Sequence, residues 1–180
     1  MALEYCGNTT GAQGVYWLDD TNDETTNNRD LTNNNTVGFV AGNFDNCADF
    51  GTANTNKSLD RADNFGWSGG NISISFWVKI RTEPGVGVNY TLVSLVSLTN
   101  QNAFLLRYET DTPSINAYRY RLNVAAPTAT YNATLGTAAW HHIVMTYDGT
   151  NIRLYTDGIL RATTAASGNG SAGSDTTGFT

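Results

Sequence analysis

The chain has few charged side chains and only two cysteines. Of its 180 residues, 14% are charged, and the formal net charge at pH 7 is −6. This acidic balance argues against a nucleic-acid partner, because a face that binds nucleic acid needs basic side chains to meet phosphate. It also disfavours anionic membrane surfaces. No apolar run approaches the roughly 20 residues of a membrane span, so we expect no membrane insertion.

A recognisable leader is also missing. The first residues, MALEYCGN, show no basic start followed by an apolar stretch, so no signal peptide is visible. Two explanations stay open: the chain is the mature part of a secreted protein, or it is made in a cytoplasm and carried outside on an assembly such as a virion. The composition is rich in Asn and Thr, which suits an exposed surface. We therefore expect an extracellular or virion-surface location.

Cys6 and Cys47 are the two cysteines, and their spacing matches no zinc or redox motif. A bridge between them would close a loop of about 40 residues and contribute on the order of 3–4 kcal/mol. Two separate thiols, one of them buried, are the alternative. The sequence leaves these two states open.

Apolar and polar residues alternate along several segments, which is the period of a half-buried β-strand. The clearest alternation sets Ser73, Ser75, Trp77 and Lys79 opposite Ile72, Ile74, Phe76, Val78 and Ile80. A second one sets Arg119, Arg121 and Asn123 opposite Tyr118, Tyr120, Leu122 and Val124. The dipeptides Asp148-Gly149 and Asp157-Gly158 suit tight hairpin turns, because glycine tolerates positive φ. No stretch of useful length has a helical period, so the pattern predicts an all-β sandwich.

The length fits one domain over residues 1–180, which is large enough to bury roughly 70% of its unfolded surface. Two segments are polar enough to be loops. Residues 20–35 are nearly all Asp, Asn and Thr, and residues 163–180 form a tail rich in Ala, Ser, Gly and Thr.

Four segments, in order along the chain, resemble the laminin-G-like domains of the concanavalin A-like lectin superfamily. They are residues 15–19 (VYWLD), 42–51 (GNFDNCADFG), 71–79 (NISISFWVK) and 140–162 (WHHIVMTYDGTNIRLYTDGILRA). The resemblance implies an antiparallel jelly-roll β-sandwich of the concanavalin A-like kind. It implies no particular ligand, because this superfamily includes lectins, adhesion modules, virion proteins and glycosidases.

The resemblance also implies more strands than the chain supplies. In the family, the loop after the last hairpin leads into two further strands, the second with an Ile-Asp-x-Val-like element. Here the chain ends at Thr180, just as the residues TTGFT resemble the first of them. We expect that the domain is truncated or that another chain donates the missing strand. A family member with a shorter sandwich is the alternative.

Enzymatic chemistry finds little support in the sequence. Glycosidases of this superfamily carry alternating carboxylates on one strand, so that an acid and a nucleophile flank one glycosidic bond. Only Glu109 and Asp111 come close to this pattern, and Pro113 stands where a third acid is needed. We interpret Glu109 as a strand end entering a turn. His141 and His142 are adjacent and so point to opposite faces of a strand, and the resemblance makes His142 a position within the sandwich, with His141 facing solvent.

Calcium is a possible cofactor implied by the resemblance, since many laminin-G-like domains hold this cation with carboxylate and carbonyl oxygens. Asp19 and Asp30 are the candidate ligands, in or beside the polar loop. Two departures weaken this expectation: the family's Phe-Asp-Gly is Phe50-Gly51 here, and the C-terminal Ile-Asp element is absent. A solvated polar loop without metal is the alternative.

A carbohydrate site needs an aromatic face for stacking and planar polar groups for hydroxyls. The candidate ligand-binding residues are Trp67 in a glycine-rich loop, Arg107, Glu109, Arg119, Arg121 and Asn123. Their alternative roles are ordinary: arginines on a solvated strand face, and a tryptophan that caps the core. Trp17, Trp77 and Trp140 match strand positions of the family and are expected to be packing residues.

These observations favour a non-catalytic recognition or adhesion module, most of all for glycans, with a glycan or a surface protein as its partner. The alternative is a structural subunit of a surface assembly, such as a virion decoration protein or a filament, whose main contacts are with copies of itself.

Overall fold

The computed structural model describes residues 12–51, 56–62, 65, 70–83, 85–97, 104–109, 113–119, 126–166 and 176–179. Contacts divide the chain into two compact units, Met1–Arg61 and Ala62–Thr180. The described residues form β-strands and no helix, and hence no helix that could cross a membrane. The expectation of one domain over residues 1–180 stays a prediction.

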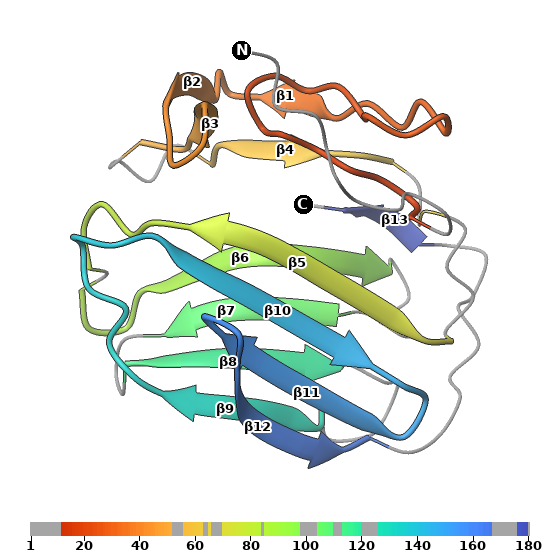
Figure 1. The fold of residues 1–180 in the computed structure, drawn as a ribbon, viewed down its shortest axis with the longest axis vertical. Helices are drawn as coiled ribbons and strands as arrows, with labels where there is room; N and C mark the ends of the chain where they lie inside the picture. The colour runs from red at the N-terminus through yellow and green to blue at the C-terminus, as the bar shows by residue number, and fades with distance from the viewer. Residues whose placement is uncertain are drawn as a thin grey trace. The chain divides into compact units, whose positions relative to one another are not determined.

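The first unit contains two small antiparallel pairs (Figure 1). Strand β1 (Thr32–Asn34) pairs with β4 (Ser58–Asp60), and strand β2 (Gly38–Ala41) pairs with β3 (Asn46–Asp49). Cys47 lies in β3 opposite Val40. Cys6 lies outside the described residues, so the disulfide between Cys6 and Cys47 stays a prediction.

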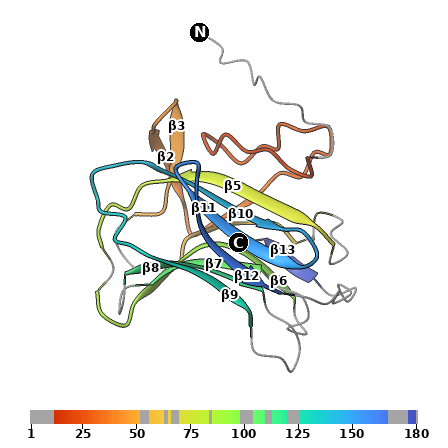
Figure 2. The same cartoon turned by 60° about the horizontal axis from the view of Figure 1, so that its bottom comes forward.

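The second unit is an antiparallel β-sandwich, as Figure 2 shows. One sheet has the order β12-β11-β10-β5 and the other has the order β13-β6-β7-β8-β9. The strands are β5 (Ile72–Val78), β6 (Asn89–Ser97), β7 (Phe104–Glu109), β8 (Ser114–Arg119), β9 (Thr128–Asn132), β10 (His141–Tyr147), β11 (Asn151–Thr156), β12 (Ile159–Ala165) and β13 (Thr176–Phe179). The predicted all-β sandwich is therefore confirmed.

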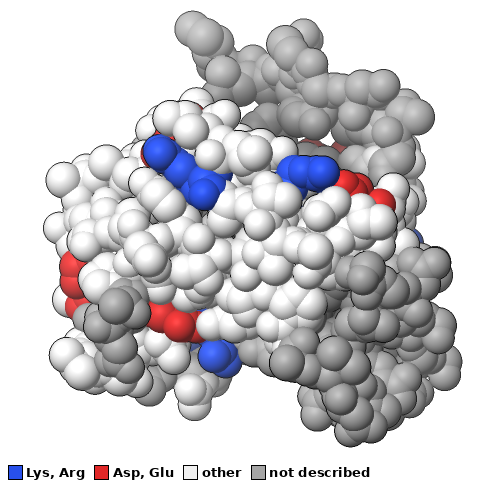
Figure 3. Space-filling model, turned by 90° about the horizontal axis from the view of Figure 1, so that it is seen from below, with Lys and Arg blue, Asp and Glu red and all other residues white. Residues whose placement is uncertain are grey.

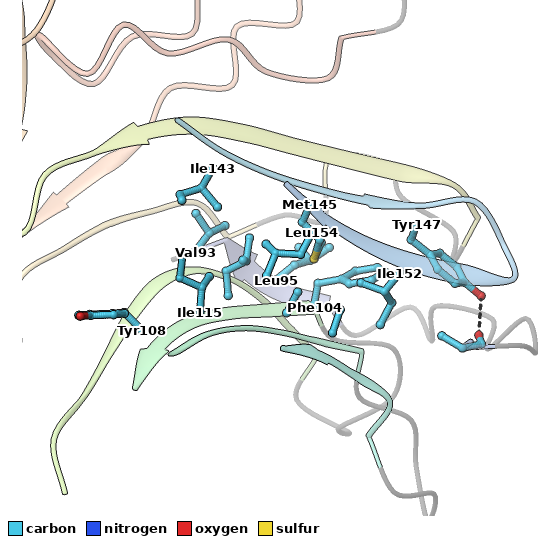
Figure 4. Packing of buried hydrophobic residues seen from close by; sticks show 14 of the residues in the cluster. Val93, Leu95, Phe104, Tyr108, Ile115, Ile143, Met145, Tyr147, Ile152 and Leu154 are labelled. Atoms are coloured by element: carbon cyan, nitrogen blue, oxygen red, sulfur yellow. Dashed lines mark hydrogen bonds between the residues drawn. The ribbon is translucent and has the colours of Figure 1, made fainter. Parts of the chain in front are cut away.

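The apolar residues of both sheets point into the space between them (Figure 4). Ile143, Met145 and Leu154 come from one sheet and meet Phe104 and Ile115 from the other, and all five are buried. Full burial of such a side chain contributes about 1.5–3 kcal/mol. The alternation predicted for β5 is also confirmed, because Ile72, Ile74, Phe76 and Val78 pack against this core.

The two Asp-Gly turns join the last three long strands. At the β11–β12 turn, Asp157 has φ 53° and Gly158 has φ 77°, which is the left-handed backbone that a two-residue hairpin turn requires. At the β10–β11 turn, the Asp148 carboxylate accepts hydrogen bonds from the backbone N–H groups of Thr150 and Asn151 at 2.9 and 2.7 Å. The Asp148 carboxylate thus holds its own turn, and the backbone of Asp157 and Gly158 has the conformation of a hairpin turn.

The segment TTGFT contributes to the fold. Strand β13 pairs with β6, with Thr176 opposite Ser97 and Phe179 opposite Leu95. The resemblance of this segment to the next strand of a laminin-G-like domain therefore agrees with its pairing. Donation of a further strand by another chain stays a prediction.

Candidate functional site

The sheet that contains β6, β7, β8 and β9 has one face toward the core and one polar face. Directly opposite residues in antiparallel strands project to the same side, so the register aligns three rows across this face. We call these rows the polar face: Asn89, Glu109, Ser114 and Asn132; Thr91, Arg107, Asn116 and Thr130; and Ser94, Leu105, Tyr118 and Thr128.

A bulge in β6 lets residues on both sides of it contribute to the polar face. The register shifts between Thr91 and Val93, and such an extra residue changes the side to which the rest of the strand points. Thr91 and Ser94 therefore share the polar face although they are three residues apart. Val93 and Leu95 belong to the core instead.

The centre of the polar face is a hydrogen-bonded row of small polar groups. The Thr130 hydroxyl donates to Oδ1 of Asn116 at 2.6 Å, and Nδ2 of Asn116 donates to the Ser114 hydroxyl at 2.9 Å. Asn116 and Ser114 are both buried. These bonds fix the orientation of the amide, so the row presents its donors and acceptors in one arrangement.

Arg107 lies directly opposite Asn116 in the same row. Its Nε is buried and has no hydrogen-bond partner among the described residues. A buried donor that stays unpaired costs about 1–3 kcal/mol, and more when the group is charged. The guanidinium therefore supplies an unused donor on a face whose other central groups are already bonded.

Glu109 lies two residues further along β7, and its Oε1 accepts a hydrogen bond from the Tyr118 hydroxyl. Glu109 is the last described residue of β7, and the turn predicted to follow it lies outside the described residues. In the three described rows Glu109 is the only carboxylate, whereas glycoside hydrolysis of the usual kind needs two. Asp111 lies outside the described residues.

The structure brings two of the predicted ligand-binding residues, Arg107 and Glu109, onto one face. Arg119 is opposite Phe104 in the register, and its side chain is outside what the structure describes. Trp67, Arg121 and Asn123 also lie outside the described residues, so their roles stay predictions.

Sequence reasoning missed Ser114, Asn116, Tyr118 and Thr130. The second alternation placed Tyr118 on the apolar side of its strand, which is wrong, because its hydroxyl binds Glu109 on the polar face. The core residues of β8 are Ile115 and Ala117, and these precede the segment on which the assignment was based. The alternation of Ser114, Asn116 and Tyr118 with them is the signal that would have found this row.

The two adjacent histidines take the opposite sides from those expected. His141 shares the side of Ile143 and Met145, and its Nε2 lies 2.9 Å from the carbonyl oxygen of Leu135. His142 lies on the outer side of its sheet and stacks on Trp77. The assignment of His141 to solvent and His142 to the interior was wrong, because the buried residues of β10 are the odd-numbered ones.

Trp77 also departs from its expected packing role. It shares the outer side of β5 with Ser73 and Ser75, as the alternation predicted, and 42% of it is exposed. Trp17 has the same exposed fraction in the first unit. The alternation along β5 thus predicted the side of Trp77 correctly, whereas its match to a family position did not.

The polar loop that was expected to bind calcium is organised by its own hydrogen bonds. The Asp23 carboxylate accepts bonds from the backbone N–H groups of Val15, Thr25 and Arg29, at 2.9–3.0 Å. Burial disfavours the charged form of Asp23, but these hydrogen bonds outweigh it and lower the pKa of the carboxyl. Asp30 accepts a bond from the Asp23 N–H at 3.0 Å.

No group of three or more His, Cys, Asp or Glu side chains in the described part of the chain is placed to hold a metal ion. Calcium binding by Asp19 and Asp30 stays a prediction.

Several solved structures have a similar fold. Domain 4 of AbnA, an extracellular GH43 arabinanase of Geobacillus stearothermophilus solved in complex with arabinotriose, matches with a TM-score of 0.64 and 16% identity over 89% of this chain and 76% of that one. Domains LG4-5 of the mouse laminin α1 chain match with a TM-score of 0.50 and 18% identity, over 67% of this chain and 30% of that one.

A carbohydrate-binding module from Bacillus subtilis, CBM66, matches with a TM-score of 0.47 and 13% identity, over 83% of this chain and 85% of that one. At these identities the likenesses show the fold. No curated protein sequence matches the chain. A laminin-G family model described as the concanavalin A-like lectin/glucanases superfamily matches residues 50–179, and the chain therefore belongs to this superfamily.

Proposed function

We propose that the protein is a non-catalytic glycan-binding module that holds its ligand on the polar face. The observation that carries the proposal is the buried Nε of Arg107, which has no partner among the described residues and lies in the row of the fixed Asn116 amide. Because this Nε is inaccessible to solvent, a sugar hydroxyl or ring oxygen would satisfy it after a rotation of the Arg107 side chain toward the ligand. The bound arabinotriose of the arabinanase domain supports the choice of ligand class, since the two folds are alike.

Arg107 and Glu109 provide complementary groups for adjacent hydroxyls. They are two residues apart on β7, which separates them by roughly 7 Å along the strand, a distance comparable to one sugar ring. The Arg107 guanidinium offers only donors, and the Glu109 carboxylate offers acceptors. A hydroxyl can both donate and accept, so a row of hydroxyls fits between these two side chains.

The distribution of charge favours a neutral sugar. In the rows of the polar face Arg107 and Glu109 are the only charged side chains, and they have opposite signs. On the edge of the sandwich that Figure 3 shows, the described charged side chains are also few. A surface of this kind creates no strong field that would attract a charged ligand over a distance. Hydrogen bonds and shape would therefore decide the specificity.

The test is isothermal titration calorimetry of the full chain with arabinotriose and with other neutral oligosaccharides, such as xylotriose and cellotriose. We expect Arg107→Ala to weaken binding at least tenfold, because a hydrogen bond to a charged group contributes about 1.5–3 kcal/mol. Arg81→Ala is the matched control, since Arg81 is exposed and lies outside the polar face. A folded Arg107→Ala protein that binds as well as the wild type would refute this site.

The same samples test the other parts of the proposal. A non-catalytic module releases no reducing sugar from arabinan or xylan during long incubation. We propose that the protein acts outside the cell, where its Asn- and Thr-rich surface would meet glycans. Sedimentation velocity separates this role from self-assembly: a glycan-binding module keeps its affinity at concentrations at which it sediments as a monomer.

A further inference from the structure

The outer side of the other sheet carries a second pattern that the proposed function does not use. The register of β5, β10, β11 and β12 aligns three rows on the side away from the core. We call them the outer face: Trp77 and His142; Ser75, Val144, Tyr155 and Leu160; and Ser73, Thr146, Arg153 and Thr163.

The aromatic part of the outer face is held rigidly. The rings of Trp77 and His142 are stacked, with centroids 5.1 Å apart and an interplanar angle of 27°. Nε2 of His142 lies 2.8 Å from the Ser75 hydroxyl, and the backbone N–H of His142 donates to Oδ1 of Asp157 at 2.9 Å. A ligand that stacks here loses little side-chain entropy on binding, because the rings are already ordered.

Two large apolar side chains of the outer face, Trp77 and Leu160, remain partly in contact with water. Trp77 is 42% exposed and Leu160 is 50% exposed, and each Å² of apolar surface left in water forgoes about 25 cal/mol. The Ser75 hydroxyl lies in the same row as Leu160, and the hydroxyl-bearing Ser73 and Thr146 lie in the next row. The outer face therefore combines an apolar plane with many weak hydrogen-bonding groups.

The outer face also has almost no net charge. Arg153 is the only lysine, arginine or carboxylate in its rows, and Nη1 of Arg153 forms an ion pair with Oδ2 of Asp148. Lys79 is exposed and follows Trp77 on the same side, just beyond the end of β5, so the charge beside these rows is sparse. A neutral sugar matches the pattern better than a charged ligand does, because its C–H face stacks on an aromatic ring while its hydroxyls bond to the polar groups at the edge.

We propose that the outer face is a second carbohydrate-binding surface, on which a neutral sugar ring stacks on Trp77 while Ser75 and His142 bind its hydroxyls. This surface is on the opposite sheet from the polar face, so it does not depend on the proposed function of Arg107. Binding at one face can therefore fail while binding at the other is retained.

The test observes Trp77 directly. The full chain is labelled with 5-fluorotryptophan, and the spectrum of Trp77→Phe identifies the fluorine signal of Trp77 among those of the four tryptophans. Arabinotriose, xylotriose and cellotriose are then added in turn. We expect the Trp77 signal to shift with at least one of these sugars, and to shift equally in the Arg107→Ala variant.

Affinity electrophoresis in gels that contain arabinan, xylan or cellulose derivatives measures the effect on binding. We expect Trp77→Ala to lower the affinity of the Arg107→Ala background at least tenfold, and Trp77→Tyr to retain part of it. Trp17→Ala is the matched control, because Trp17 is equally exposed but belongs to the other unit.

Two results would overturn the proposal. One is a Trp77 signal that stays in place with every sugar at its solubility limit. The other is a Trp77→Ala variant that is folded by circular dichroism and binds every polysaccharide like its parent, even if it loses self-association in the ultracentrifuge. The latter result would assign the outer face to a protein contact instead.

Discussion

The Asp157 carboxylate joins the β11–β12 turn to the first residues of β10. Its Oδ2 lies 3.0 Å from Nδ1 of His141, and its Oδ1 accepts a hydrogen bond from the backbone N–H of His142 at 2.9 Å. Burial disfavours the charged form of Asp157, but the bonds from His141 and His142 outweigh it and lower the pKa of the carboxyl. The Asp157 side chain thus ties the β11–β12 turn to His142, which belongs to the outer face.

Asp157→Asn should lower the free energy of unfolding at pH 7 by about 1 kcal/mol, because a bond to a charged acceptor is replaced by a weaker one. Asparagine tolerates the left-handed backbone at this position, so the turn itself is retained. A carboxyl with a lowered folded pKa stabilises the fold above its unfolded pKa of about 3.9 and loses this contribution as the pH falls through the folded value.

Urea unfolding at pH 7 and at pH 2.5 measures this difference. The two proteins should differ clearly at pH 7 and less at pH 2.5. A difference that is equal at both pH values would show that the charge of Asp157 contributes nothing.

Tyr108 links three segments at one end of the core. Its hydroxyl donates to Oε2 of Glu83 at 2.6 Å and accepts a bond from the backbone N–H of Leu135 at 3.2 Å. Tyr108→Phe should cost about 1–3 kcal/mol of unfolding free energy, because it leaves buried polar groups unpaired. Leu106→Val at a neighbouring core position is a control for the loss of packing alone.

Burial of Tyr108 and its bond to Glu83 raise the pKa of the phenol to about 12. Its contribution to stability is therefore complete below pH 10, the unfolded value, and is lost as the pH rises toward 12. Absorbance at 295 nm should show one tyrosine that titrates late, and Tyr108→Phe should remove that step. A titration curve unchanged by the substitution would contradict this assignment.

Tyr118→Phe should weaken glycan binding without a large change in the fold. The tyrosine hydroxyl holds Glu109 in place on the polar face, so its removal leaves the carboxylate free to adopt other rotamers. We expect a loss of about threefold to tenfold in affinity, which corresponds to ~1 kcal/mol. Calorimetry with the same oligosaccharides measures it, with Tyr90→Phe as the control. Equal affinities would show that Glu109 does not act through Tyr118.

Arg161 connects the two sheets at the β9–β12 side. Its guanidinium carbon lies 4.7 Å from the centroid of the Tyr131 ring, and its Nε donates to the Thr156 hydroxyl at 2.7 Å. Arg161→Gln should lower the unfolding free energy by about 0.5–2 kcal/mol. Arg153→Gln, whose parent side chain is in an exposed ion pair, should cost less than 1 kcal/mol. Thermal unfolding that ranks the two variants in the opposite order would contradict this.

The fold could be predicted because its signals are local. The alternation of β5 and the Asp-Gly turns follow from side chains next to one another in sequence, and they were confirmed. The side that a strand turns to the core is harder to predict when the apolar residues change sides along the segment, as they do between Ile115 and Ala117 on one side and the later Tyr118 on the other. Tyr118 was misassigned for this reason, and the sides of His141 and His142 were misassigned because the resemblance, not the neighbours Ile143 and Met145, was followed.

The candidate site was predictable only in part. Arg107 and Glu109 carry charge and lie two residues apart, so sequence alone brings them to one face. Asn116 and Thr130 join them only through the pairing of β7, β8 and β9, which no short-range pattern reveals. The bulge in β6 is equally invisible in the sequence, although it decides which residues complete the rows.

Because the two sheets pack face to face, the polar face and the outer face determine how many sugar chains one module can bind. Packed sheets lie roughly 10 Å apart, and the polar face and the outer face look away from each other. A sugar chain held on one of them cannot fold back within a few residues to occupy the other. A module with sugar bound at both faces would therefore join two separate polysaccharide strands. It would act as a cross-link between chains.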